Sequence, residues 1–132
     1  ELNGQGGQLP LVISMGAVLQ MRMRIHSREN RAPVALFGIT RADGTPVYGV
    51  SSEMDEVPIR QEENGTFVAT IEFSSINLLP GGYNLRAHVL DTEGVRLFDT
   101  EERGLSVRGE TREFGMVRLP HRWVDTGKQP ID

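Results

Sequence analysis

Apolar residues recur at every second position through much of this 132-residue chain. In residues 18–27 the alternating apolar positions are Leu19, Met21, Met23 and Ile25. Residues 67–73 repeat the pattern with Phe67, Ala69, Ile71 and Phe73. This period is that of a β-strand with one buried face. Because no segment keeps a helical period over the roughly ten residues that predict a helix, we expect an all-β fold.

Turn residues separate the predicted strands. Asp43-Gly44 and Asn64-Gly65 are typical of hairpin turns. Residues 33–40 are almost wholly apolar, as in a central strand that is buried on both faces. Further strands are expected at residues 95–100, around Leu105 and Val107, and at residues 115–123. About seven to nine short strands predict an immunoglobulin-like antiparallel β-sandwich of two sheets.

Residues 79–83 contain a local signal for the same fold. The sequence Leu-Pro-Gly-Gly-Tyr places a tight turn before Tyr83 at the start of an apolar strand. In immunoglobulin-like sandwiches a tyrosine at such a corner donates a hydrogen bond from its hydroxyl to upstream backbone. We therefore expect a structural role for Tyr83.

Composition limits the domain organisation and the partners. We expect a linker or disordered lead-in at residues 1–10, a sandwich at 11–124 and a tail at 125–132. The start at Glu1 suggests a fragment of a longer protein. A formal net charge of −4 argues against nucleic acid as a partner. The chain has no cysteine, so disulfides and thiolate metal sites are excluded, and no apolar run reaches the length of a membrane span.

Signatures of catalysis are missing from the sequence. His26, His88 and His121 are dispersed without metal-ligand spacing, so we expect no metal and no cofactor. The carboxylates cluster at residues 53–56, 62–63 and 101–102, in polar sequence rather than in the apolar surroundings that a general acid needs. The chain is therefore predicted not to be an enzyme.

One predicted strand carries an unusual polar face. In residues 79–94, Tyr83, Leu85, Ala87 and Val89 alternate with Asn84, Arg86 and His88. The polar row could be a solvated surface, but Thr, Lys and Glu would be more typical of such a surface. An amide, a guanidinium and an imidazole in a row suit ligand binding better. The rival polar face consists of Gln20, Arg22, Arg24 and His26, for which we favour a solvated sheet with cross-strand acid partners.

Three stretches in order resemble a known family. They are ADGTPVYGVSS at residues 42–52, LLPGGYNLRAHVLDTEG at 78–94 and GMVRLPHRW at 115–123. From about Gly16 to Trp123 the chain resembles the carbohydrate-binding C-terminal domain of the ATP-binding subunit of O-antigen polysaccharide ABC exporters, the Wzt type. The resemblance implies non-catalytic binding of a lipid-linked O-polysaccharide that couples recognition of the completed glycan to export. The nucleotide-binding domain that the full-length protein would carry is absent from this chain.

The resemblance also implies partners and a site. It predicts a location at the cytoplasmic side of the inner membrane of a Gram-negative bacterium, beside the nucleotide-binding domain and the membrane subunit of the transporter. A homodimer by C-terminal strand exchange would involve Val117, Leu119, His121 and Trp123. The glycan would lie on an exposed sheet face, where Tyr48 and Phe98 could stack on sugar rings beside Asn84, Arg86 and His88. The alternatives are a generic immunoglobulin-like protein-interaction module and a small glycan-acting enzyme with two close carboxylates.

Overall fold

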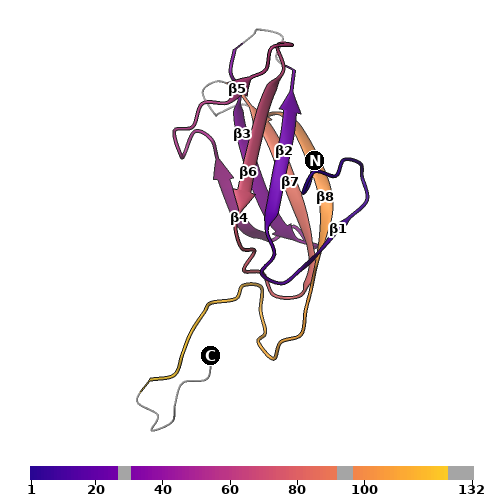
Figure 1. The fold of residues 1–132 in the computed structure, drawn as a ribbon, viewed down its shortest axis with the longest axis vertical. Helices are drawn as coiled ribbons and strands as arrows, with labels where there is room; N and C mark the ends of the chain where they lie inside the picture. Colours follow the sequence, from indigo (N-terminus) through magenta and orange to yellow (C-terminus); the bar gives the residue numbers. More distant parts are fainter. Residues whose placement is uncertain (27–30, 92–96, 125–132) are drawn as a thin grey trace.

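The computed structural model describes residues 1–26, 31–91 and 97–124, with backbone only for residues 97 and 98 (Figure 1). Two sheets are formed by the strands β1 (Leu11–Ser14), β2 (Leu19–Ile25), β3 (Val34–Arg41), β4 (Pro46–Ser51), β5 (Arg60–Gln61), β6 (Phe67–Phe73), β7 (Gly81–Leu90) and β8 (Leu97–Arg108). The described residues contain no helix, and so none that could span a membrane. The all-β sandwich prediction is confirmed.

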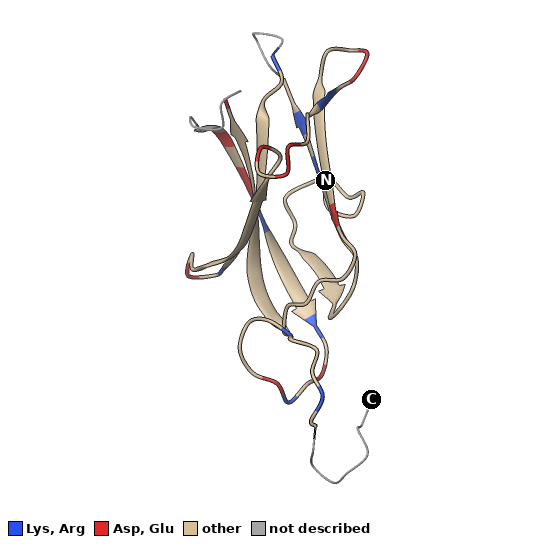
Figure 2. Cartoon of the chain, turned by 90° about the vertical axis from the view of Figure 1, so that its left-hand side faces the viewer, with Lys and Arg blue, Asp and Glu red and all other residues tan. Residues whose placement is uncertain are grey.

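The two sheets lie as separate layers when the molecule is viewed from the side (Figure 2). The larger sheet has the order β1-β8-β7-β3-β4 and the smaller one the order β2-β6-β5. Strand β7, which carries the polar row, is therefore the central strand of the larger sheet. All pairs are antiparallel except β1 with β8, which is parallel and departs from the expected antiparallel pattern.

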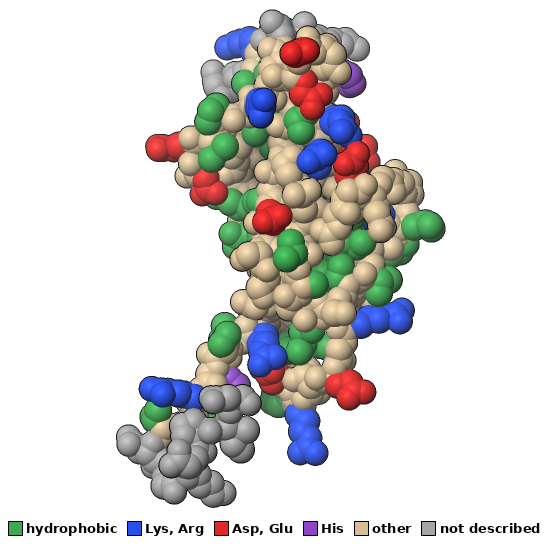
Figure 3. Space-filling model, in the orientation of Figure 1, with side chains coloured by type: hydrophobic (Ala, Val, Ile, Leu, Met, Phe, Trp, Pro, Cys, Tyr) green, Lys and Arg blue, Asp and Glu red, His purple; other side chains and the backbone are tan. Residues whose placement is uncertain are grey.

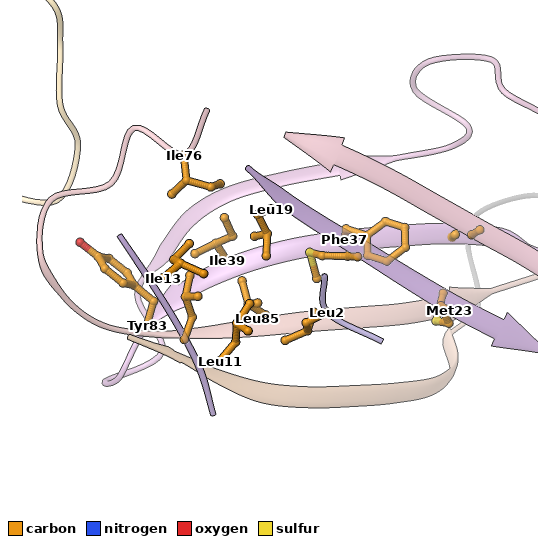
Figure 4. Close-up of a cluster of buried hydrophobic side chains, with 14 of the residues drawn as sticks. Leu2, Leu11, Ile13, Leu19, Met23, Phe37, Ile39, Ile76, Tyr83 and Leu85 are labelled. Atoms are coloured by element: carbon orange, nitrogen blue, oxygen red, sulfur yellow. The ribbon is translucent and has the colours of Figure 1, made fainter. Parts of the chain in front are cut away.

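The core fills the space between the inner faces of the two sheets (Figure 4). The predicted apolar alternation in β2 and β7 accounts for much of it: Leu19 and Leu85 are 0% and 2% exposed. Tyr83 lies at one end of this cluster with its hydroxyl pointing out of the apolar contacts. A rigid layered core of this kind holds the outward side chains of β7 in fixed positions.

Two strand predictions were wrong near the C-terminus. Residues 97–108 form one strand instead of two. The prediction missed its continuity because Arg103, which pairs with Leu85 at an inward-facing position, interrupts the apolar alternation. Residues 115–123 form no strand. Only residues 116–118 meet other backbone, in a short antiparallel contact with residues 77–79. The segment then runs away from the sandwich (Figure 1).

Residues 1–10 make contacts with the sandwich that the sequence did not indicate. Leu2 is 6% exposed and belongs to the core, where it forms isolated bridges with Gln5 and Met21. The Arg103 guanidinium also holds this segment, since its Nε donates to the carbonyl oxygen of Leu9 at 2.6 Å. The predicted tail at 125–132 lies outside the described residues.

Candidate functional site

Asn84, Arg86 and His88 lie together on the outer face of β7, as the alternation predicted. Each is half-buried, whereas the alternating residues Tyr83 and Leu85 are buried in the core. Strand β3, on one side of this row, presents small or apolar residues to it. Thr40, Gly38 and Leu36 of β3 stand opposite Asn84, Arg86 and His88, respectively.

Strand β8 supplies partners to two members of the row. The Nε of Arg86 lies 3.4 Å from Oε2 of Glu102, directly across the strand pair. The side chains of Arg86 and Glu102 are 36% and 46% exposed, so the pair is open to solvent. Nδ1 of His88 lies 2.9 Å from the hydroxyl oxygen of Thr100. Side chains of β8 therefore contact two of the three residues of the row.

The charge of the row is nearly balanced. Burial, and then the nearby Arg86 guanidinium, lower the pKa of His88, and the Glu102 carboxylate opposes that shift. The imidazole is therefore neutral at pH 7, and the Arg86–Glu102 pair carries opposite charges. Together these groups offer hydrogen-bond donors and acceptors without a strong net field.

Of the two predicted stacking residues, the structure places only Tyr48, and it does not join the row. Tyr48 pairs with Ile39 on the inner-face register, and its ring meets Phe73 of the other sheet edge-on, with 6.0 Å between the ring centroids. Tyr48 therefore stands on the opposite side of the sheet from Arg86. The side chain of Phe98 lies outside the part of the chain that the structure describes.

The predicted dimer residues lie on the segment that leaves the sandwich. Val117, Leu119 and Trp123 are 46%, 72% and 76% exposed. The ring Nδ1 of His121 lies 2.9 Å from the carbonyl oxygen of Leu119. In the space-filling view this segment extends from the main body of the domain and carries hydrophobic as well as basic side chains (Figure 3).

The rival face on the smaller sheet is largely occupied by internal contacts. Arg22 Nε donates to the hydroxyl of Thr70 at 3.3 Å, and Gln20 donates to Glu72 at 3.5 Å. Arg24 forms an ion pair with Glu1 at 2.9 Å. Charged side chains of both signs are interspersed on the surface in view in Figure 3. These contacts match the expected solvated sheet.

The sequence did not indicate a cleft of about 980 Å³ at the open edge between the two sheets. It forms because β5 has only two residues and pairs with β6 only at Val68 and Phe67. Its lining includes Phe37, Ile59 and Ile71, and the carboxylates of Asp55, Glu62 and Glu63. These three acids are exposed, which does not suit the apolar surroundings of a general acid. The described residues contain no cluster of three potential metal ligands.

Comparison with known proteins identifies the family of this fold. A sequence model of the Wzt C-terminal domain matches residues 2–119. A crystal structure of the C-terminal domain of Wzt superposes with a TM-score of 0.64 at 15% identity, covering 86% of this chain and 73% of that one. CopC from Methylosinus trichosporium OB3b gives a TM-score of only 0.44 at 12% identity, over 81% of this chain and 91% of that one. A search of curated proteins finds no match. The family match covers most of the chain, which therefore belongs to the Wzt C-terminal domain family.

Proposed function

We propose that this domain binds O-antigen polysaccharide without cleaving it and couples recognition of the completed glycan to its export by an ABC transporter. Membership of the Wzt C-terminal domain family supports the exporter role. The observation that carries glycan binding is the half-buried row of Asn84, Arg86 and His88 on the central strand of the larger sheet.

The chemistry of the row suits a sugar. Each sugar hydroxyl both donates and accepts, and the Arg86–Glu102 pair offers donors and acceptors side by side. An ion pair that is this exposed contributes about 0–1 kcal/mol to stability, so glycan hydroxyls can compete for either partner. Because β7 is held by strands on both sides, little conformational entropy is lost when a ligand binds.

Retention on the host's own O-polysaccharide tests this proposal. Arg86→Ala and His88→Ala should each lose retention on the immobilised polysaccharide while the thermal midpoint stays nearly unchanged. Arg24→Ala and His26→Ala are matched controls on the rival face and should bind as the wild type does. Loss of retention in the controls alone would move the site to the smaller sheet. Absence of retention by the wild type would favour the protein-interaction alternative.

We also propose that the domain forms a homodimer by exchange of its C-terminal segment. Val117, Leu119 and Trp123 present apolar side chains to solvent at alternate positions, and a second chain would cover them. His121 would lie in the same interface. Two domains held together would strengthen weak binding to a repetitive polysaccharide through avidity.

The proposed partners follow from the exporter role. We place the domain at the cytoplasmic side of the inner membrane of a Gram-negative bacterium. There a nucleotide-binding domain and the membrane subunit of the transporter would accompany it, and the glycan would be linked to lipid.

A further inference from the structure

Two glycines stand opposite each other in the interior of neighbouring strands. Gly38 of β3 pairs with Gly49 of β4, and Gly38 also pairs with Arg86 of β7. Glycine within a strand weakens it, since it contributes no packing and loses more backbone entropy on folding. Two such residues side by side need an explanation.

The fold itself does not require glycine at either position. Neither residue has the positive φ that favours glycine. A Cβ atom at Gly38 would lie 3.5 Å from the carbonyl oxygen of Tyr48, and one at Gly49 would lie 3.9 Å from that of Phe37. Both distances are ordinary van der Waals contacts. At Gly104, by contrast, a Cβ would lie 3.3 Å from that of Pro10, so close packing accounts for that glycine.

The space above the two glycines is open among the described residues. Apart from the chain neighbours of each glycine, no described side chain comes within 4 Å of either Cβ position. Gly49 is exposed and Gly38 is half-buried. With Cβ absent at both positions, the outer surface of the sheet forms a shallow floor of backbone next to the Arg86 side chain. We call Gly38 and Gly49 the glycine floor.

A second observation at this floor points to a ligand. Thr40 is on the same face of β3 as Gly38 and is only 8% exposed, yet its hydroxyl has no hydrogen-bond partner. Nε of Arg86, opposite Gly38, is also buried without a hydrogen-bond partner, because its contact with Glu102 has ion-pair distance but not hydrogen-bond geometry. Buried polar groups are normally paired, so two unpaired ones around one floor indicate a missing partner.

We propose that the glycine floor is a subsite for one uncharged sugar ring of the polysaccharide. The ring's flat C–H face lies on the backbone of Gly38 and Gly49. Its hydroxyls bond to the exposed parts of Arg86 and Glu102 and, once the Thr40 side chain rotates toward the ring, to the Thr40 hydroxyl. An uncharged ring fits because Glu102 already balances the charge of Arg86. This inference rests on the proposed function and names the part of the site that contacts the ring.

Alanine substitution gives a test with opposite effects on stability and binding. Gly38→Ala and Gly49→Ala should leave the thermal midpoint unchanged or raise it by up to about 5 °C. Each should weaken binding of the host's O-polysaccharide at least about tenfold, because the added methyl group lifts the ring off the floor. Gly82→Ala is the matched control: Gly82 is on the same face of β7, exposed, with nothing within 4 Å of its Cβ position.

Thr40→Val tests the unpaired hydroxyl in the same way. It preserves side-chain shape, so we expect unchanged or higher stability together with weaker binding. A fall in the thermal midpoint of Gly38→Ala and Gly49→Ala would show that the glycines serve the fold and would overturn the subsite. Wild-type binding by both alanine variants would also overturn it.

Two further readouts separate this inference from the proposed function. If the wild type does not bind, the proposed function fails; if Arg86→Ala loses binding while the glycine variants do not, only the subsite fails. Binding of an uncharged ring should be unaffected by NaCl between about 50 and 500 mM. A steep loss of affinity with salt would contradict the uncharged ligand.

Discussion

The Tyr83 hydroxyl donates a hydrogen bond of 2.6 Å to the carbonyl oxygen of Leu79, four residues earlier in the chain. This bond closes the turn that leads into β7, as the tyrosine corner of immunoglobulin-like sandwiches does. The same hydroxyl lies 3.2 Å from the carbonyl oxygen of Met116, so it also ties down the start of the C-terminal segment. Tyr83 is 6% exposed, and the bond is therefore shielded from water.

Replacing Tyr83 with phenylalanine removes this bond and leaves the ring in place. We expect the free energy of unfolding to fall by about 1–2 kcal/mol, because the Leu79 carbonyl remains buried without its partner. Urea denaturation of the wild type and Tyr83→Phe measures the difference. Tyr48→Phe is the control, since Tyr48 is 53% exposed and its hydroxyl makes no described hydrogen bond. Equal losses in both variants would contradict the structural role of Tyr83.

The alternation of apolar residues was enough to predict the sheets and the face of the polar row. It succeeded in β2 and β7 because each has one buried face and one exposed face, which is the condition that produces a period of two. It failed in β8, where Glu101 and Arg103 lie on the inward register opposite Ala87 and Leu85. Polar residues at inward positions remove the signal.

Register explains why the position of Tyr48 was wrong. Residues 47–50 show no clear alternation, so only the pairing of Ile39 with Tyr48 decides which way the ring points. An irregularity between Ile39 and Thr40 shifts the register next to that pair. The cleft beside β5 depends on how far the segments on either side of this two-residue strand lie from the larger sheet. A pattern of residue types does not encode that separation.

The lowered pKa of His88 makes stability depend on pH. The folded state disfavours the protonated imidazole. The unfolded state therefore binds more protons than the folded state as the pH falls below about 6.5. The free energy of unfolding therefore carries no penalty from His88 above that pH, and it decreases as the pH falls through the folded-state pKa. The thermal midpoint of the wild type should fall more between about pH 7.5 and 5.5 than that of His88→Gln. An NMR titration that gives His88 a pKa at or above 6.5 would contradict this.

The Arg86–Glu102 pair should contribute little to stability. Both side chains are more than one-third exposed, and solvent screens their attraction. A double-mutant cycle with Arg86→Met and Glu102→Gln should give a coupling energy below about 1 kcal/mol by urea denaturation. A coupling above about 2 kcal/mol would show that the guanidinium is fixed by its partner and not free for a ligand.

Tyr48 should matter for stability and not for glycan binding. Tyr48→Ala removes the edge-on contact with Phe73, and we expect a loss of about 0.5–1.5 kcal/mol in the free energy of unfolding. Retention on the host's O-polysaccharide should stay at the wild-type level, because the ring lies on the other side of the sheet from Arg86. Loss of retention at unchanged stability would return Tyr48 to the binding site.

The exposed C-terminal segment leads to a prediction about oligomeric state. Leu119 is 72% exposed, and a charge placed there costs nothing in a monomer but is buried in the proposed dimer interface. Leu119→Glu should therefore shift the protein from dimer to monomer in sedimentation velocity, with the thermal midpoint of the monomer retained. Leu9→Glu is the matched control, since Leu9 is 79% exposed at the other end of the chain and should leave the dimer intact. A wild type that sediments as a monomer at high micromolar concentration would refute the exchange. A dimer that persists in Leu119→Glu would place the interface on a different surface.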